Sequence, residues 1–345
     1  MEEPDTRLFA VNDPRAFLSK HPNGLIIDEA QRAPELFSYI QTLVDADRKP
    51  GQIILTGSQH FLLHEKISQM SAGRVAIFQL LPFCLDELLK HFSHRETFQK
   101  YIYQGFYPPL YDQPLSPQDW YGNYIITYVE RDVRQLKNIS DLNTFTTFLK
   151  LCAGRIGQLM NLTSMANELG VSVNTIRSWL SVLEASFIIF HLPPYYKNFN
   201  KRLVKIRKLY FYDTGLACYL LGIRNVSDLD THFLRGELFE NLIISEIIKF
   251  FNNRAELPGF YFWRDRSGRE VDFLIEYGRS VKAIEIKIAQ TISKEFFKGL
   301  TYWQQISGIT SDDSYIVYGG DQRQKRSQGE IIPWYEVPNW LKEVY

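Results

Sequence analysis

The sequence predicts an α/β protein with several domains, and three observations carry this prediction. Short apolar runs alternate with helical stretches between residues 25 and 85, residues 120–184 have the pattern of successive helices, and three strand-like runs follow a long amphipathic helix near the end of the chain. The chain has 345 residues, of which 45% are hydrophobic and 23% charged, which is within the globular range. At roughly 100–200 residues per domain, this length predicts two or three domains.

Composition excludes several classes of protein. Lys+Arg and Asp+Glu both number 39, so any attraction to nucleic acid must come from a local patch. Cys84, Cys152 and Cys218 lie far apart, which indicates neither a disulfide framework nor a zinc site. No apolar run approaches the roughly 18 residues that span a bilayer, and the chain starts with acidic residues. We therefore expect a cytoplasmic protein that does not contact a membrane.

In residues 1–92 we expect a parallel sheet with strands at 25–27, 53–55 and 75–78 and a helix over 34–47. The first strand ends in Asp28 and Glu29, which is the form of a Walker B element. There the Asp can bind Mg²⁺ and the Glu can polarise the water that attacks a phosphate. The alternative is that the two acidic residues simply begin the next helix.

The second strand also ends in small polar residues. Ser58 is the better candidate and Thr56 the second for a sensor beside the γ-phosphate of ATP. Arg74 directly precedes the third expected strand, where an arginine finger would stabilise transition-state charge. Arg74 as an ordinary surface cation remains the alternative.

These segments carry a family resemblance. Residues 3–7, 25–31, 54–59, 72–74 and 81–83 together resemble prokaryotic AAA-plus-like ATPases that carry a C-terminal domain of unknown function, DUF4143. The resemblance extends over nearly the whole chain. It implies a partial P-loop NTPase sheet, bound ATP and Mg²⁺, and a homo-oligomer formed through the ATPase domain.

One motif of these ATPases is missing from the sequence. No GxxxxGK[ST] run occurs anywhere in it, although such a P-loop supplies most of the affinity for phosphates. We therefore expect a chain that begins partway into the ATPase domain. Its sheet should have an uncovered edge or apolar face, its ATP binding should be weak or absent, and it should hydrolyse little or no ATP.

We expect a helical lid or linker over 93–140 and a winged-helix segment over 141–203. Residues 162–180 have the helix-turn-helix form, with Thr163 or Ser164 capping the first helix and Gly170 giving the turn. Ser172 or Asn174 would cap the second helix. Strand 187–191 and the return of the chain resemble a wing, and the residues expected to face the core are Ile176, Leu180 and Leu183.

Two features of this segment suggest contact with DNA. The second helix has Arg177 as its only cation and Glu184 as its only carboxylate, so this helix indicates contact with DNA only weakly. A stronger basic patch, interleaved with aromatic residues, consists of Lys197, Lys201, Arg202, Lys205, Arg207 and Lys208. The equally weighted alternative is that this region packs between domains or subunits.

Residues 204–345 contain the pattern of a metal-dependent nuclease. Asp272 lies on one expected strand, and Glu285 and Lys287 share one face of the next. Together with Glu240 on the preceding helix, they match the PD-(D/E)xK arrangement, in which carboxylates bind Mg²⁺ and the Lys orients water. The alternative is an amphipathic hairpin with exposed charges. Asp213, in the 213–216 turn, we assign to packing.

The leading hypothesis is an ATP-binding, DNA-associated protein whose nucleotide site is incomplete in this chain. A Mg²⁺-dependent DNA endonuclease that uses Glu240, Asp272, Glu285 and Lys287 is the first alternative. The second is a scaffold without catalysis that binds a protein partner.

Overall fold

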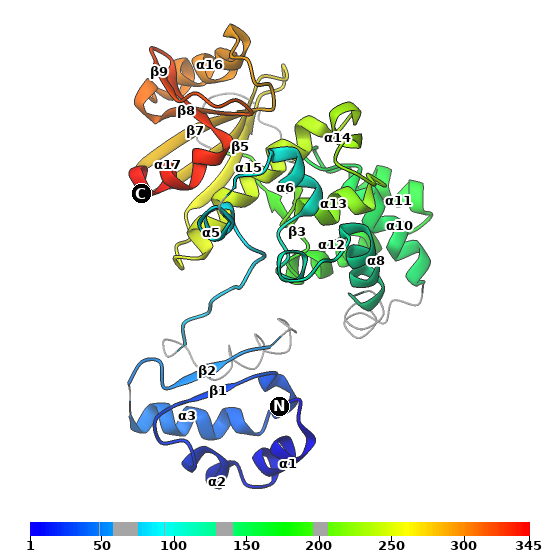
Figure 1. Ribbon diagram of the computed structural model, residues 1–345, viewed down its shortest axis with the longest axis vertical. Helices are drawn as coiled ribbons and strands as arrows, with labels where there is room; N and C mark the ends of the chain where they lie inside the picture. Colours follow the sequence, from blue (N-terminus) through cyan, green and yellow to red (C-terminus); the bar gives the residue numbers. More distant parts are fainter. Residues whose placement is uncertain (48, 58–74, 93, 129–140, 196–205) are drawn as a thin grey trace. The chain divides into compact units, whose positions relative to one another are not determined.

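A computed structural model describes the chain except for residues 48, 58–74, 93, 129–140 and 196–205 (Figure 1). The chain divides into two compact units, residues 1–77 and 78–345. The division into segments 1–92, 93–140, 141–203 and 204–345, which we expect from the sequence, remains a prediction. Among the described residues, no helix has the length and apolar character needed to cross a membrane.

The first unit contains a small parallel sheet. Strands β1 (Leu25–Ile27) and β2 (Ile53–Leu55) pair in parallel, with Leu25 opposite Ile53. Buried side chains of the helices and of β1 form one core, which includes Phe17, Ile27 and Phe37. The helices are α1 (Pro4–Asn12), α2 (Pro14–Ser19) and α3 (Leu36–Ala46), with a 3₁₀ turn at Ala30–Arg32.

One face of this sheet is open to solvent. Ile26 is 66% exposed and Ile54, its partner in the register, is 49% exposed. This confirms the expected uncovered apolar face. The prediction of a third strand at 75–78 was wrong, because the described residues 75–80 form neither strand nor helix.

The second unit begins with a group of helices, of which α6 and α8 pack against α13. The helices of this layer are α5 (Leu85–His91), α6 (Phe98–Gln104), α7 (Pro109–Asp112), α8 (Pro117–Thr127), α13 (Thr214–Leu220) and α14 (Asp228–Thr231). Buried Asp213 caps α13 through the Leu216 amide at 2.7 Å. It also accepts from the Phe106 amide and the Tyr121 hydroxyl, both at 2.6 Å. These bonds support the assignment of Asp213 to packing.

A helix-turn-helix follows within the same unit. Its two helices are α11 (Leu162–Leu169) and α12 (Val173–Ala185). Helix α10 (Leu142–Ala153) precedes them, and an antiparallel pair of strands, β3 (Ile189–Leu192) and β4 (Lys208–Phe211), follows. Gly170 has φ 66°, a left-handed conformation that suits glycine and makes the turn, as predicted. Ser172 caps α12, also as predicted, but the cap of α11 is Asn161 rather than Thr163 or Ser164. The predicted core residues Ile176, Leu180 and Leu183 are buried.

The last part of the chain forms a six-stranded mixed sheet in the order β5-β6-β7-β8-β10-β9. The first three strands are antiparallel neighbours, β7, β8 and β10 run parallel, and β9 is antiparallel to β10. The strands are β5 (Gly259–Arg264), β6 (Glu270–Tyr277), β7 (Ser280–Lys287), β8 (Ser314–Tyr318), β9 (Gln324–Arg326) and β10 (Gly329–Pro333). The three strands predicted here are therefore confirmed.

Helices cover both faces of this sheet, because its strands are apolar on both sides. The long helix α15 (Arg235–Asn252) shares a core with Phe273 and Ile284, and α17 (Val337–Val344) joins the same core. Helix α16 (Lys298–Ser307) packs on the opposite face, where Trp303 meets Leu274 and Ala283. A 3₁₀ turn, η3 (Lys294–Phe297), leads into α16.

Helix α15 is tied to the segment before α5 by a buried charge pair. Glu246 and Lys249 lie one turn apart, with the Lys249 Nζ 3.0 Å from Glu246 Oε1. Glu246 also accepts from the Leu85 amide, and Lys249 donates to the Phe83 carbonyl at 2.9 Å. Because every one of these groups finds a partner, the pair fixes the position of α15, which carries Glu240.

Candidate functional site

Strands β6 and β7 bring Asp272, Glu285 and Lys287 together. Phe273 pairs with Ile284, so Asp272 and Glu285 are the next residues along the two strands. The Ile286 amide donates to Asp272 Oδ2 at 2.8 Å instead of to the backbone of β6. Lys287 Nζ lies 3.0 Å from Asp272 Oδ2 and 2.5 Å from Glu285 Oε2. The lysine therefore bridges two carboxylates at the end of the strand pair.

A second lysine, Lys208, binds Glu240, which is the acidic residue that helix α15 contributes. Lys208, on β4, lies with its Nζ 3.2 Å from Glu240 Oε1 and forms an ion pair with Glu270. Glu240 also accepts a hydrogen bond from the Tyr210 hydroxyl at 2.5 Å, and Arg264 binds the other oxygen of Glu270 at 3.0 Å. Lys208 and Tyr210 are two residues apart on β4, so they reach the same side.

We refer to these residues as the carboxylate–lysine cluster, which contains Lys208, Glu240, Glu270, Asp272, Glu285 and Lys287. Lys208 corrects a prediction, since it is only 4% exposed and belongs to this cluster rather than to a surface patch. Sequence reasoning missed Glu270 and the role of Lys208 in the cluster, as well as Tyr210, which binds Glu240 from outside it. The alternation of Lys208 and Tyr210 along one strand was the signal that could have linked them to Glu240.

Burial and charge shift the pKa values within the cluster in opposite directions. Burial raises the pKa of Glu240 to about 7, against the lowering effect of Lys208. Burial and the neighbouring Asp272 raise the pKa of Glu285 well above its ordinary value. For Asp272 burial acts upwards, but Lys287 and Lys208 outweigh it and the pKa lies below the usual value. The two carboxyls side by side thus differ in acidity, as expected for close like charges.

The pKa values of the two lysines are raised. Burial acts to lower the pKa of Lys208, but Glu240, Tyr210 and Glu270 raise it well above the ordinary value. For Lys287, Asp272 and Glu285 likewise overcome burial and raise the pKa. Both lysines are therefore charged at neutral pH and hold the carboxylates that surround them.

The arrangement does not fit a bound metal ion. Within the part of the chain that the structure describes, no group of three or more Asp, Glu, His or Cys side chains is placed to bind a metal. Lys287 binds one oxygen of Asp272 and one of Glu285, and Lys208 binds one oxygen of Glu240 and one of Glu270. These ammonium groups compete with Mg²⁺, which would need two or more of the same carboxylates as ligands.

The first turn of α16 closes the cluster on one side. A Cβ atom added to Gly299 would lie 2.0 Å from Glu285 Oε1 and 2.5 Å from the Glu270 carbonyl oxygen. Such distances are far below van der Waals contact, so only glycine lets α16 approach this closely. Glu285 is 4% exposed as a result of this packing and of the sheet beneath it.

The carboxyl ends of β1 and β2 carry the residues predicted for a nucleotide site. The Thr56 hydroxyl donates to Asp28 Oδ1, while backbone bonds from Thr56 N to Ile27 O and from Ala30 N to Thr56 O, both 3.0 Å, extend the strand pair. Asp28 is exposed, and Glu29 next to it has a left-handed backbone with φ 51°. Asp28 and Thr56 thus meet, whereas Ser58 and Arg74 lie outside the described residues.

The residues predicted to bind DNA are only partly described. Arg177 on α12 and Arg207 before β4 are both exposed. Glu184, the only carboxylate of α12, binds the His191 ring nitrogen at 2.5 Å and is thereby drawn toward β3. The others, Lys197, Lys201, Arg202 and Lys205, lie outside the described residues.

Three family models match successive parts of the chain. Residues 1–89 match an AAA domain, residues 95–227 match a domain of unknown function (DUF8612), and residues 235–337 match another domain of unknown function (DUF4143). The first of these regions is thus similar to an AAA domain, and the last is similar to DUF4143 domains. The predicted resemblance to these two families is confirmed, whereas the DUF8612 match was not predicted.

Curated relatives come from distant prokaryotes, and each is described as uncharacterized. Protein Rv2008c of Mycobacterium tuberculosis is 29% identical over 283 residues, which is 81% of this chain and 62% of the relative. A Haemophilus influenzae protein is 22% identical over 57% of this chain and 51% of its own length. Protein MJ1637 of Methanocaldococcus jannaschii is 22% identical over 65% of this chain and 47% of its own length. The chain therefore spans about half to three fifths of the curated relatives it matches.

Among solved structures, protein VC1899 from Vibrio cholerae matches over 99% of this chain and 86% of its own. Its sequence identity is 12% and the TM-score is 0.25.

Proposed function

We propose that this chain is a DNA-associated protein of the AAA-domain ATPase class that contacts DNA through helix α12. The observation that carries the proposal is the exposed face of α12. Asn174, Arg177 and Ser181 lie there at helical spacing, and all are exposed. Arg and Asn are the side chains that most often read guanine and adenine in the major groove.

The surrounding elements support this assignment. The order α10, α11, α12, β3, β4 is that of a winged-helix domain. The segment between α10 and α11 adds two isolated bridges to this strand pair, from Ile156 to Leu209 and from Leu159 to Lys208 of β4. In such domains the second helix of the helix-turn-helix is the one that enters the major groove.

The charge of α12 also suits DNA. Arg177 is the only cation of α12, and Glu184 is its only carboxylate. Glu184 lies two helical turns after Arg177 with its side chain 39% exposed, and the His191 ring nitrogen binds one of its oxygens. A face of this kind would contact base edges and add little to the electrostatic part of the affinity.

The test compares the wild type with Arg177→Ala on fluorescently labelled duplex DNA, measured by fluorescence anisotropy at several salt concentrations. Loss of a base contact should weaken binding by roughly 1–3 kcal/mol, with little change in the salt slope. The matched control is Arg279→Ala, which removes one exposed arginine from the β6–β7 turn. Equal binding by Arg177→Ala and Arg279→Ala would contradict a role for α12.

The nucleotide half of the proposal rests on Asp28 and Thr56. Their position at the carboxyl ends of two parallel strands is where open α/β sheets bind ligands. Asp28 is the residue that would hold Mg²⁺, and Mg²⁺ would supply charge neutralisation of the phosphates there. Because the sequence has no P-loop, we expect ATP to bind weakly and to be hydrolysed little or not at all.

A second candidate function, DNA cleavage, is favoured by one observation. The order α15, β5, β6, β7, α16, β8 is that of the PD-(D/E)xK fold, and it brings Asp272, Glu285 and Lys287 together at the end of β6 and β7. Against cleavage stands the binding of Asp272 and Glu285 by Lys287 and of Glu240 by Lys208. We therefore infer that the domain keeps the arrangement for structure or for binding.

A nuclease assay decides between the two. Supercoiled and branched DNA is incubated with Mg²⁺ or Mn²⁺ and the wild type, Asp272→Ala or Lys287→Ala. We expect no cleavage by any of them. Cleavage by the wild type that Asp272→Ala abolishes would overturn our inference and establish a metal-dependent nuclease, whereas cleavage that survives Asp272→Ala would come from a contaminant or another site.

A further inference from the structure

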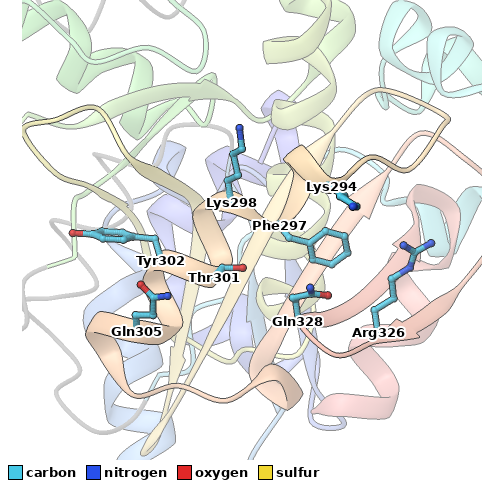
Figure 2. A pocket seen from close by; sticks show the side chains of 8 residues that line it. All are labelled: Lys294, Phe297, Lys298, Thr301, Tyr302, Gln305, Arg326 and Gln328. Carbon is cyan, nitrogen blue, oxygen red and sulfur yellow. The ribbon is translucent and has the colours of Figure 1, made fainter.

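Helix α16, the turn before it and the β9–β10 hairpin border an open pocket of about 440 Å³ (Figure 2). One face of α16 forms its first wall, because Lys298, Thr301, Tyr302 and Gln305 line it at the spacing of successive helical turns. The other face of α16, with Leu300 and Trp303, is buried against the sheet. The pocket therefore lies on the side of α16 that faces away from the hydrophobic core.

The second wall is fixed to the first. Gln304 on α16 donates from its Nε2 to the Gln328 carbonyl oxygen in the hairpin and to Ser314 Oγ at the start of β8, both at 2.8 Å. These bonds join helix, hairpin and strand. The opening between α16 and Gln328 is consequently set by the fold, so the pocket exists before a ligand arrives.

The pocket has a strong excess of positive charge. Lys294, Lys298 and Arg326 line it, all three are exposed, and its lining contains no carboxylate. Lys298 does pair with Glu295, but both side chains are mostly exposed, at 71% and 68%, so the pair competes weakly with a ligand. Within the described residues, no ion pair holds Lys294 or Arg326. An anion would therefore replace few existing interactions.

The polar groups are separated along the pocket. Figure 2 shows Lys294 and Arg326 on one side, Tyr302 and Gln305 on the other, and Thr301 and Gln328 between them. At that end the Tyr302 ring is held by the guanidinium of Arg269, which is not part of the pocket lining and lies 4.1 Å from the ring centre. One end thus suits a phosphate, and the other suits a planar ring with amide hydrogen bonds from Gln305.

We propose that this pocket binds one phosphorylated nucleoside, with its phosphate at Lys294 and Arg326 and its base toward Tyr302 and Gln305. The volume is suited to a small ligand and too small for a duplex. The nucleotide is either free or the 5′-phosphorylated end of a single strand, since both present the same chemistry. The proposal does not depend on DNA binding by α12.

The experiment uses isothermal titration calorimetry on the full chain. Its ligands are deoxyadenosine 5′-monophosphate, deoxyadenosine, inorganic phosphate, and a ten-nucleotide single strand with and without a 5′-phosphate. The test variant is Lys294→Ala/Arg326→Ala. The matched control is Lys325→Ala/Lys90→Ala, which removes two cations that pair with Asp312 and Asp86 and do not line the pocket. Thermal unfolding by circular dichroism verifies that each variant is folded.

We expect the monophosphate to bind, deoxyadenosine not to bind, and the test variant to weaken binding roughly 10- to 100-fold, as loss of charge-assisted hydrogen bonds implies. The control should bind like the wild type. Tighter binding of the 5′-phosphorylated strand than of the monophosphate, lost in the same variant, assigns the site to strand ends, and the reverse assigns it to free nucleotides. Equal affinity for inorganic phosphate and the monophosphate, or binding that the test variant leaves unchanged, would overturn the proposal.

Discussion

Two strand ends in this molecule carry carboxylates, and they differ in what surrounds them. Asp28, at the end of β1, is exposed and binds one threonine hydroxyl. Asp272, at the start of β6, is buried together with Glu285 and is bound by Lys287 and a backbone amide. The first side chain keeps oxygen lone pairs turned to water, whereas the second uses its oxygens inside the protein.

The difference separates two roles for the same kind of residue. A carboxylate at an exposed edge can exchange water for a metal or nucleotide at small cost to the fold. A carboxylate in a buried, lysine-balanced cluster cannot, because removing its partner leaves an uncompensated charge in the interior. The motif alone does not distinguish the two cases, since both read as acidic residues at strand ends.

The largest effect should follow from removing a lysine of the buried cluster. Lys208→Met leaves Glu240 and Glu270 without their shared cation, in a site where the Lys208 side chain is 5% exposed. We expect the free energy of unfolding of the second unit to fall by about 3–5 kcal/mol. Urea titration followed by tryptophan fluorescence measures it, because all six tryptophans lie after residue 78.

The control for this variant is Lys90→Met, on α5. Lys90 pairs with Asp86 but its side chain is 69% exposed, so its removal should change the free energy of unfolding little. A loss of stability in Lys208→Met no greater than that in Lys90→Met would show that the cluster does not depend on its lysines.

The next effect concerns pH. Burial raises the pKa of Glu240 to about 7, so between pH 4.5 and 7 the folded state holds a proton that the unfolded chain has released. The free energy of unfolding should therefore fall as the pH rises through this window, by at most about 3 kcal/mol from this group. Glu285, whose pKa is also raised, acts in the same direction.

Glu240→Gln tests this origin, because glutamine cannot titrate. The decline in stability between pH 5 and 7, measured by the same urea titrations, should be shallower in Glu240→Gln than in the wild type. Glu295→Gln, which removes a carboxyl that is 68% exposed, should leave the decline unchanged. Identical slopes in Glu240→Gln and the wild type would assign the pH dependence to other groups.

The sequence predicted most of the elements in the second unit, because their signals are local. Gly170 and Ser172 mark the turn of the helix-turn-helix within three residues, and alternation along 281–288 marks β7. It also predicted that Glu285 and Lys287 share a face. The cap of α11 was missed because Asn161 lies one residue before the expected start.

The features of the fold and of the site that the sequence could not predict depend on contacts between distant segments. Lys208 ends a basic run, which suggested a surface patch, and only the pairing of β4 with β3 buries it beside Glu240 and Glu270. The expected strand at 75–78 failed because apolar character alone does not supply a neighbouring strand with which to pair. Whether a carboxylate holds a lysine or a metal is decided by such long-range neighbours.

We expect the smallest effect on stability from a substitution of Asp28, at the exposed end of β1. Asp28→Asn removes a charge that water already solvates, so hydrogen exchange in β1, β2 and α3 should report a change in stability within about 0.5 kcal/mol. A fluorescent ATP analogue with Mg²⁺ should bind the wild type more weakly than the micromolar range, because no P-loop surrounds the phosphates, and Asp28→Asn should reduce this weak binding only slightly. Submicromolar binding at a one-to-one ratio that Asp28→Asn abolishes would instead mean that another element replaces the P-loop. A large loss of stability in Asp28→Asn would mean that this carboxylate, like Asp272, serves the fold.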